Sequence, residues 1–303
     1  MKTALPVVLK VLALTLILFA CYAIAGGVVG PRGDSPTPEE AGGAALALLA
    51  ACFLITLVLT HLILRSRWGG GRLMAAVFFV FYGVTTFMSQ IESAVFVTRL
   101  PPGTLPRLFL MGALIAAPYS VLAVLILGKR RADAGDAEGD ARLVMPAGEW
   151  AWKLAAIALT YLILYFTFGY FIAWRDPAVR EYYGGIDEGS FIAHMEALMR
   201  GDTSWLIPFQ ILRAMLWAAL ALPVVRMMKG SWPEKALAVG LLFSVVMNAQ
   251  LLLPNPYMPE GVRMTHLIET ASSNLIFGLV VGWLLARPHE FGQVPAPQSK
   301  GAA

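Results

Sequence analysis

Residues 265–285 read THLIETASSNLIFGLVVGWLL, and the contrast between the two halves of this stretch decides the fold class. The second half is apolar and, with its flanks, reaches the roughly 20 residues that a helix needs to cross the hydrocarbon core of a bilayer. The first half carries a histidine, a glutamate and several hydroxyl and amide side chains. Ionisable side chains that face lipid are costly, so this half predicts a polar interior within a membrane protein.

The composition and the recurrence of such apolar runs extend this interpretation to the whole chain. Of its 303 residues, 58% are hydrophobic and 14% are charged, whereas a soluble domain is about 25% charged. We therefore predict an all-α integral membrane protein, a bundle of about eight transmembrane helices. The predicted spans are 6–26, 43–65, 73–97, 106–128, 151–173, 206–226, 236–253 and 264–286.

The placement of positive charges predicts the orientation, because short cytoplasmic loops are enriched in lysine and arginine. If the N-terminus is cytoplasmic, fifteen of the 23 lysines and arginines lie in cytoplasmic segments, seven lie in outer segments, and Arg213 lies inside a helix. We expect a multi-pass protein of a bacterial-type inner membrane with both termini in the cytoplasm. Because the basic residues are explained by topology, we do not expect nucleic-acid binding.

Loops and linkers divide the chain into four segments. We expect transmembrane helices 1–4 in residues 1–128, a flexible cytoplasmic linker in 129–149, helices 5–8 in 150–287 and a disordered cytoplasmic tail in 288–303. The outer loop 174–205 should contain a short helix that lies at the membrane interface or caps the bundle, because apolar residues between 191 and 199 share one helical face. The chain carries no Walker or G-x-G-x-x-G motif, and no motif points to a named family.

Polar residues from four predicted spans fall in the outer half of the membrane. At about 1.5 Å per residue they lie roughly 5 to 12 Å from the midplane. The proposed substrate- or proton-binding residues are Glu92, Arg213, Glu269, His266 and Asn248, with Gln210, Ser89 and Ser273 on the same helical faces.

The charges of this set do not balance. Arg213 can pair with one of the two glutamates, so the other must take a proton, bind a cation or face a protonated His266. Two interpretations remain open: a structural polar network that fixes helix packing, and a functional site.

The spacing His266-x-x-Glu269 also lets two side chains on one helix hold a divalent metal, with Glu92 as a third ligand. His61 falls on the cytoplasmic side of helix 2 and cannot share that site. The loop residue His194 could reach the polar residues only if its surface helix folds over them, and His289 lies in the tail.

Three functions follow from these expectations. The first is binding or translocation of a small polar solute or ion in an outward-facing polar cavity, coupled to protons. The alternative is a membrane-embedded enzyme, metal-dependent or not, that acts on a lipid or a lipid-linked substrate. A further alternative is a non-catalytic subunit of a membrane complex. The sequence does not decide whether the protein is an enzyme.

Overall fold

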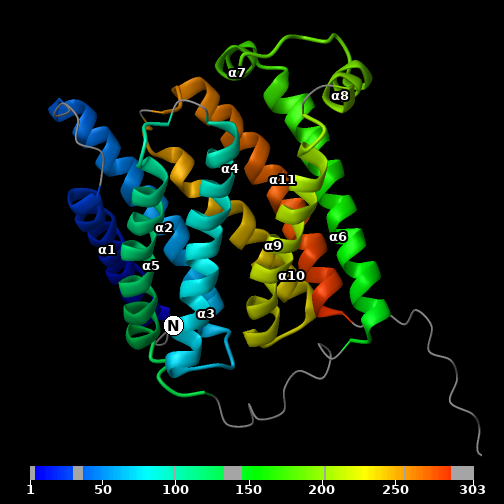
Figure 1. Ribbon diagram of the computed structural model, residues 1–303. Helices are drawn as coiled ribbons and strands as arrows, with labels where there is room; N and C mark the ends of the chain where they lie inside the picture. The colour runs from blue at the N-terminus through cyan, green and yellow to red at the C-terminus, as the bar shows by residue number, and fades with distance from the viewer. Residues whose placement is uncertain are drawn as a thin grey trace, which may run out of the picture.

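The computed structural model describes residues 4–29, 37–97, 100–132, 145–200, 203–255 and 257–287, and helices dominate these ranges (Figure 1). Eight of the helices are long and apolar enough to cross a membrane. The prediction of an all-helical chain with eight candidate membrane spans is therefore confirmed. The predicted tail 288–303 and most of the predicted linker 129–149 lie outside the described residues.

Several of the spans combine helical segments of different pitch. In chain order the spans are α1 (Ala4–Val29); α2 (Pro38–Leu64); α3 (Gly70–Tyr82), η1 (Gly83–Phe87) and α4 (Met88–Phe96); α5 (Thr104–Ile126); α6 (Ala147–Phe168) and η3 (Gly169–Trp174); α9 (Leu206–Met227); α10 (Trp232–Leu241), η4 (Leu242–Val246) and η5 (Ala249–Leu252); and α11 (Glu260–Ala286).

The spans form two groups that lie side by side (Figure 1). In the first group α1 packs against α2 and α5, and α3 packs against α5. In the second group α10 packs against α11, and α6 packs against both α9 and α11. The groups meet where η4 and η5 contact α2 and where α3 contacts α9. We call these two sets the first helix group (α1 to α5) and the second helix group (α6 to α11).

Small residues allow the tightest helix contact in the second group. A Cβ atom placed on Gly278 of α11 would lie 2.7 Å from the Cα atom of Gly240 in α10 and 2.8 Å from the carbonyl oxygen of Val239. These glycines therefore let the two backbones approach closely, as small residues commonly do in membrane helices.

Two short helices, α7 (Pro177–Tyr183) and α8 (Phe191–Arg200), lie at one end of the bundle (Figure 1). The helix predicted over residues 191–199 is present as α8, whereas α7 was not predicted. Asp176 starts α7 by accepting a hydrogen bond from the amide of Ala178, Pro177 occupies the first turn, and Gly184 ends the helix with a φ of 70°. We call this end of the molecule the α7–α8 end.

Three spans contain a π-helical turn, namely η1, η3 and η4. A π turn inserts an extra residue into an α-helix and rotates the face presented by the residues that follow it, and such turns are frequent at functional sites. Glu92 follows η1, Asn248 follows η4, and Gly169 in η3 lies against the carboxylate of Glu269. All three turns therefore adjoin the predicted polar residues.

Candidate functional site

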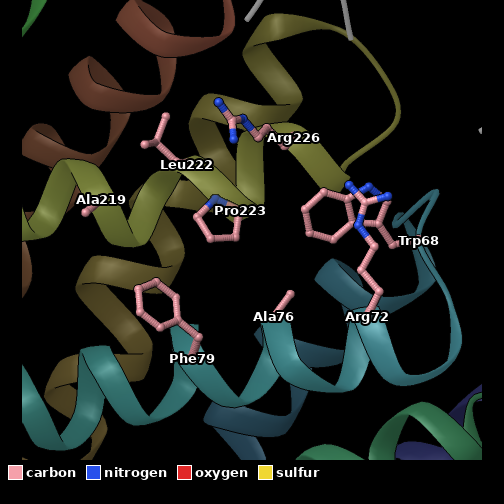
Figure 2. A pocket seen from close by; sticks show the side chains of 8 residues that line it. All are labelled: Trp68, Arg72, Ala76, Phe79, Ala219, Leu222, Pro223 and Arg226. Carbon is pink, nitrogen blue, oxygen red and sulfur yellow. The ribbon is translucent and has the colours of Figure 1, made fainter. Parts of the chain in front are cut away.

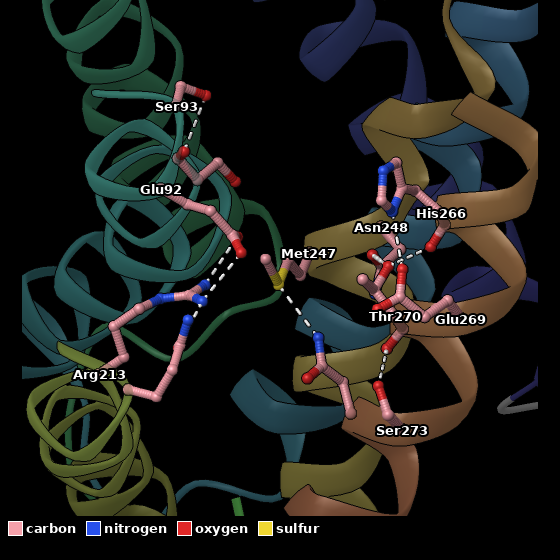
Figure 3. A network of polar contacts seen from close by, with 12 residues as sticks. Glu92, Ser93, Arg213, Met247, Asn248, His266, Glu269, Thr270 and Ser273 are labelled. Carbon is pink, nitrogen blue, oxygen red and sulfur yellow. Dashed lines mark hydrogen bonds and ion pairs between the residues drawn. The ribbon is translucent and has the colours of Figure 1, made fainter. Parts of the chain in front are cut away.

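An ion pair between Arg213 of α9 and Glu92 of α4 forms one side of the polar region (Figure 3). The Nη1 and Nη2 atoms of Arg213 donate to the two carboxylate oxygens of Glu92 at 2.9 and 2.7 Å. Such a bidentate pair is among the stronger ion-pair geometries in proteins. Of the two predicted glutamates, Glu92 is therefore the one that Arg213 contacts. The ion pair joins the second helix group to the first.

The Arg213 side chain is almost completely buried. The Arg213 side chain is 2% exposed, whereas that of Glu92 is 32% exposed. Gln210, one turn earlier on α9, accepts a further hydrogen bond from Nη1 of Arg213 at 3.0 Å, and the guanidinium lies 5.8 Å from the ring centre of Tyr161 in α6. The Nε atom of Arg213 and the Nε2 atom of Gln210 are buried donors without a hydrogen-bond partner among the residues that the structure describes. The Arg213–Glu92 cluster therefore has two hydrogen-bond donors available for a further acceptor.

A second cluster lies across from the first, on α11 (Figure 3). The Nδ1 atom of His266 is 2.7 Å from the Oε2 atom of Glu269, and these side chains are 18% and 11% exposed. On its other side, the Nε2 atom of His266 is 3.1 Å from the hydroxyl of Tyr183 in α7. A phenol, an imidazole and a carboxylate thus form one chain of hydrogen bonds from the α7–α8 end into the bundle.

The protonation of Tyr183 indicates how this chain is oriented. Desolvation of the Tyr183 hydroxyl, reinforced by the negative charge of Glu92, raises its pKa above the ordinary value of 10.0. The phenol therefore keeps its proton and donates it to Nε2 when His266 is neutral, which assigns the imidazole proton to Nδ1 and toward Glu269. If Nε2 gains a proton, the phenol oxygen must become the acceptor.

Further hydrogen bonds fix α11 against its neighbours. The Thr265 hydroxyl donates to Asp176 at 2.6 Å, and this bond, followed by that from the Ala178 amide, lowers the pKa of the Asp176 carboxyl. One turn along α11, the Thr270 hydroxyl contacts the amide oxygen of Asn248. Asn248 is 2% exposed and donates to the backbone oxygen of Ser244 at 2.7 Å. The part of α11 that carries His266 and Glu269 is therefore hydrogen-bonded both to Asp176 and to Asn248.

The structure also places the remaining predicted residues. Ser89 accepts a hydrogen bond from Gln250 at 2.9 Å, which is a further contact between the helix groups. Ser273 bonds to the backbone oxygen of Thr270 at 3.4 Å and does not join either ion pair.

His61 and His194 lie outside the two clusters. His61 is 3.9 Å from Glu234 at the opposite end of the bundle. His194 of α8 is 3.0 Å from Glu188, within the loop that holds α7 and α8.

The predicted metal ligands are divided between the two clusters. Glu92 bonds to Arg213, whereas His266 and Glu269 bond to each other. Within the described ranges no three His, Cys, Asp or Glu side chains are grouped in a way that could hold a metal ion.

Sequence reasoning missed the contributions of Tyr183, Asp176 and Gln250. The Asp176-Pro177 pair is a readable helix start, but its contact with α11 depends on how the loop folds back over the bundle. Comparisons of the chain with models of known families, with characterised proteins and with solved structures find no match. The chemistry must therefore be inferred from the site itself.

The net charge of the two clusters depends on one proton. Arg213 and Glu92 neutralise each other, so the remaining charge is that of His266 and Glu269. This second pair is negative when His266 is neutral and balanced when His266 is protonated. Together the residues provide a titratable charge, spare hydrogen-bond donors and a contact between the two helix groups.

Proposed function

We propose that the chain is a transport protein that binds a small polar solute or ion between the two clusters and couples its movement to a proton. The observation that carries the proposal is the hydrogen-bonded His266–Glu269 pair opposite the balanced Arg213–Glu92 pair. Since the His266–Glu269 pair sets the charge of the region, binding of a cation there would be coupled to the binding of a proton.

The spare donors favour a solute that carries an acceptor oxygen. A buried polar group without a partner costs about 1–3 kcal/mol, and both Arg213 Nε and Gln210 Nε2 are in this position. A carboxylate, carbonyl or hydroxyl oxygen of a bound solute would satisfy these donors. We infer that α9 binds the solute, while α11 exchanges the proton.

Contacts between the helix groups at both ends support an alternating mechanism. Arg213–Glu92 and Gln250–Ser89 join the groups in the half that lies toward the α7–α8 end, which the charge distribution predicts to be the outer half. At the opposite end, Arg65 of the first group bonds to Glu234 of the second at 2.7 Å. Rocking of one group against the other, with one set of contacts open at a time, would give access from alternate sides.

One observation favours the enzymatic alternative. A phenol held to an imidazole that is oriented by a carboxylate is an arrangement that supports acid–base or nucleophilic catalysis, and Tyr183, His266 and Glu269 have this order. The substrate would then be a lipid or lipid-linked molecule that reaches the α7–α8 end.

Solute-dependent proton movement in proteoliposomes separates these proposals. The vesicles enclose a pH-sensitive dye and receive amino acids, carboxylates, sugars or monovalent cations in turn. We expect one class to move protons with the wild type and not with His266→Gln, while the control His61→Gln, at the opposite end, keeps this activity. Turnover of a lipid-linked substrate by folded protein, without solute-driven proton movement, would replace transport with the enzymatic alternative.

A further inference from the structure

A groove of about 330 Å³ lies between α3 and α9, at the end of the bundle opposite α7 and α8 (Figures 1 and 2). Arg72 lies in the first turn of α3, and Arg226 lies in the last turn of α9. Because the two helices run in opposite directions, both arginines lie at the same end of the groove as Trp68. Figure 2 shows the Arg72 side chain against Trp68, whereas the Arg226 side chain turns away from them along α9. We call this region the α3–α9 groove.

The rest of the α3–α9 groove is apolar. Ala76 and Phe79 line it from α3, and Ala219 and Pro223 line it from α9 (Figure 2). Phe79 is 49% exposed, so this wall faces the surroundings of the bundle. Pro223 lacks the amide that would bond to the Ala219 carbonyl, which leaves that backbone oxygen without its usual helical partner. The groove thus combines a cationic end with an apolar channel along the bundle wall.

The two arginines have no carboxylate partner among the described residues. The guanidinium of Arg72 lies 3.9 Å from the ring centre of Trp68, a cation–π contact that leaves its charge uncompensated. The ion pairs of the described chain include none for Arg72 or Arg226, whereas Arg65 nearby is compensated by Glu234. An anion that reached this end of the groove would therefore meet unpaired positive charge.

Neighbouring loops add to the positive charge. The amide of Arg67 bonds to the carbonyl of Met227 at 2.7 Å, and that of Lys229 bonds to the carbonyl of Arg65 at 2.8 Å, so two basic loops are tied together. Partial desolvation and the charges of Lys129, Arg65 and Arg67 lower the pKa of Lys229. The loops beside the α3–α9 groove therefore concentrate positive charge at the ends of the spans.

We propose that the α3–α9 groove binds one anionic phospholipid, with its head group at the end where Arg72 and Arg226 lie and an acyl chain along Ala76, Phe79 and Ala219. The position fits this ligand, because both arginines lie at the ends of apolar spans, where lipid head groups are found. The excess of positive charge favours an anionic head group over a zwitterionic one of equal size. This site is separate from the clusters at Arg213 and His266.

Native mass spectrometry of the detergent-solubilised full chain tests this proposal. Phosphatidylglycerol and phosphatidylcholine with identical acyl chains are titrated separately, and inorganic phosphate is added in a third series. We expect tighter retention of the first phosphatidylglycerol than of phosphatidylcholine, and no displacement by inorganic phosphate at equal concentration. Each basic residue near an anionic lipid contributes about fivefold in affinity, so Arg72→Gln with Arg226→Gln should weaken retention on the order of tenfold or more.

Two further variants keep the test independent of folding. The matched control Arg107→Gln with Arg175→Gln removes the same charge from exposed arginines at the other end of the bundle and should retain the lipid. Ala219→Phe fills the apolar channel without changing any charge and should also weaken retention. Equal retention of the two lipids by the wild type, or equal losses in the Arg72/Arg226 variant and the control, would overturn the proposal. Displacement by inorganic phosphate would do the same, since it would indicate a simple anion site.

Discussion

Removal of Arg213 should destabilise the protein by leaving the carboxylate of Glu92 without its partner. Breaking one side of a buried ion pair costs about 3–5 kcal/mol. Because the Glu92 side chain is 32% exposed, water can partly rehydrate it, and we expect Arg213→Met to lie near about 3 kcal/mol, the lower end of that range. Glu92→Gln should cost more, because the guanidinium that it leaves unpaired is 2% exposed.

The double variants identify the partner. Arg213→Met combined with Glu92→Gln removes both charges, so its loss of stability should be smaller than the sum of the single losses by about 2 kcal/mol or more. Arg213→Met combined with Glu269→Gln should be nearly additive, because Glu269 bonds to His266 and not to Arg213. The size of the coupling energy in the two cycles therefore distinguishes the two carboxylates.

Reversible unfolding in mixed micelles, followed by helical circular dichroism, provides the free energies for both cycles. The same coupling energy for Glu92 and Glu269 would refute the assignment of the ion pair. A single Arg213→Met variant as stable as the wild type would refute the argument that this pair contributes to helix packing.

Further predictions concern packing, pH and orientation. Gly278→Ala should destabilise the fold by about 1–3 kcal/mol in the same unfolding assay, because its Cβ would meet the α10 backbone. The control Gly26→Ala should leave the stability unchanged, because a Cβ at Gly26 meets nothing within 4 Å. Equal effects of the two substitutions would contradict the close packing of α10 and α11. Acidification should release α7 from α11: the folded-state pKa of Asp176 is lowered, so its stabilisation is complete above the ordinary value of about 3.9 and is lost as the pH falls through the folded-state pKa. Hydrogen exchange of α7 measures this release, and protection that does not change in acid would contradict it. Cysteines introduced in the loop 174–205 should react with an impermeant maleimide added outside cells; labelling only after lysis would reverse the predicted orientation.

The spans could be predicted from sequence because their signal is local. Apolar runs of sufficient length in residues such as 6–26 and 43–65 do not depend on the rest of the fold. The π turns at Gly83–Phe87 and Leu242–Val246 were not predicted, since the phase shift that a π turn introduces is hidden in spans that are apolar on most faces. The pairing of α3 with α9 and of α10 with α11 likewise depends on which helices meet, which hydropathy does not encode.

The sequence was enough to name candidate residues, whereas their contacts could be predicted only in part. The cost of ionisable groups in lipid made Glu92, Arg213, His266 and Glu269 candidates, and helical spacing placed His266 beside Glu269. That Arg213 pairs with Glu92 could not be predicted, because it depends on how α4 and α9 are rotated relative to each other. The contact of Tyr183 with His266 could not be predicted either, because it depends on how the loop 174–205 folds over the bundle.

The most direct test of the proposed function is the titration of His266 by nitrogen NMR. The chain has four histidines, so the His266→Gln variant assigns the signal. When the pH is lowered from about 9 to about 4, we expect the His266 imidazole to gain a proton, a transported solute to move the midpoint, and Glu269→Gln to move it as well. A His266 signal that stays in one protonation state over this range, with and without every solute tested, would contradict the proton-coupled mechanism.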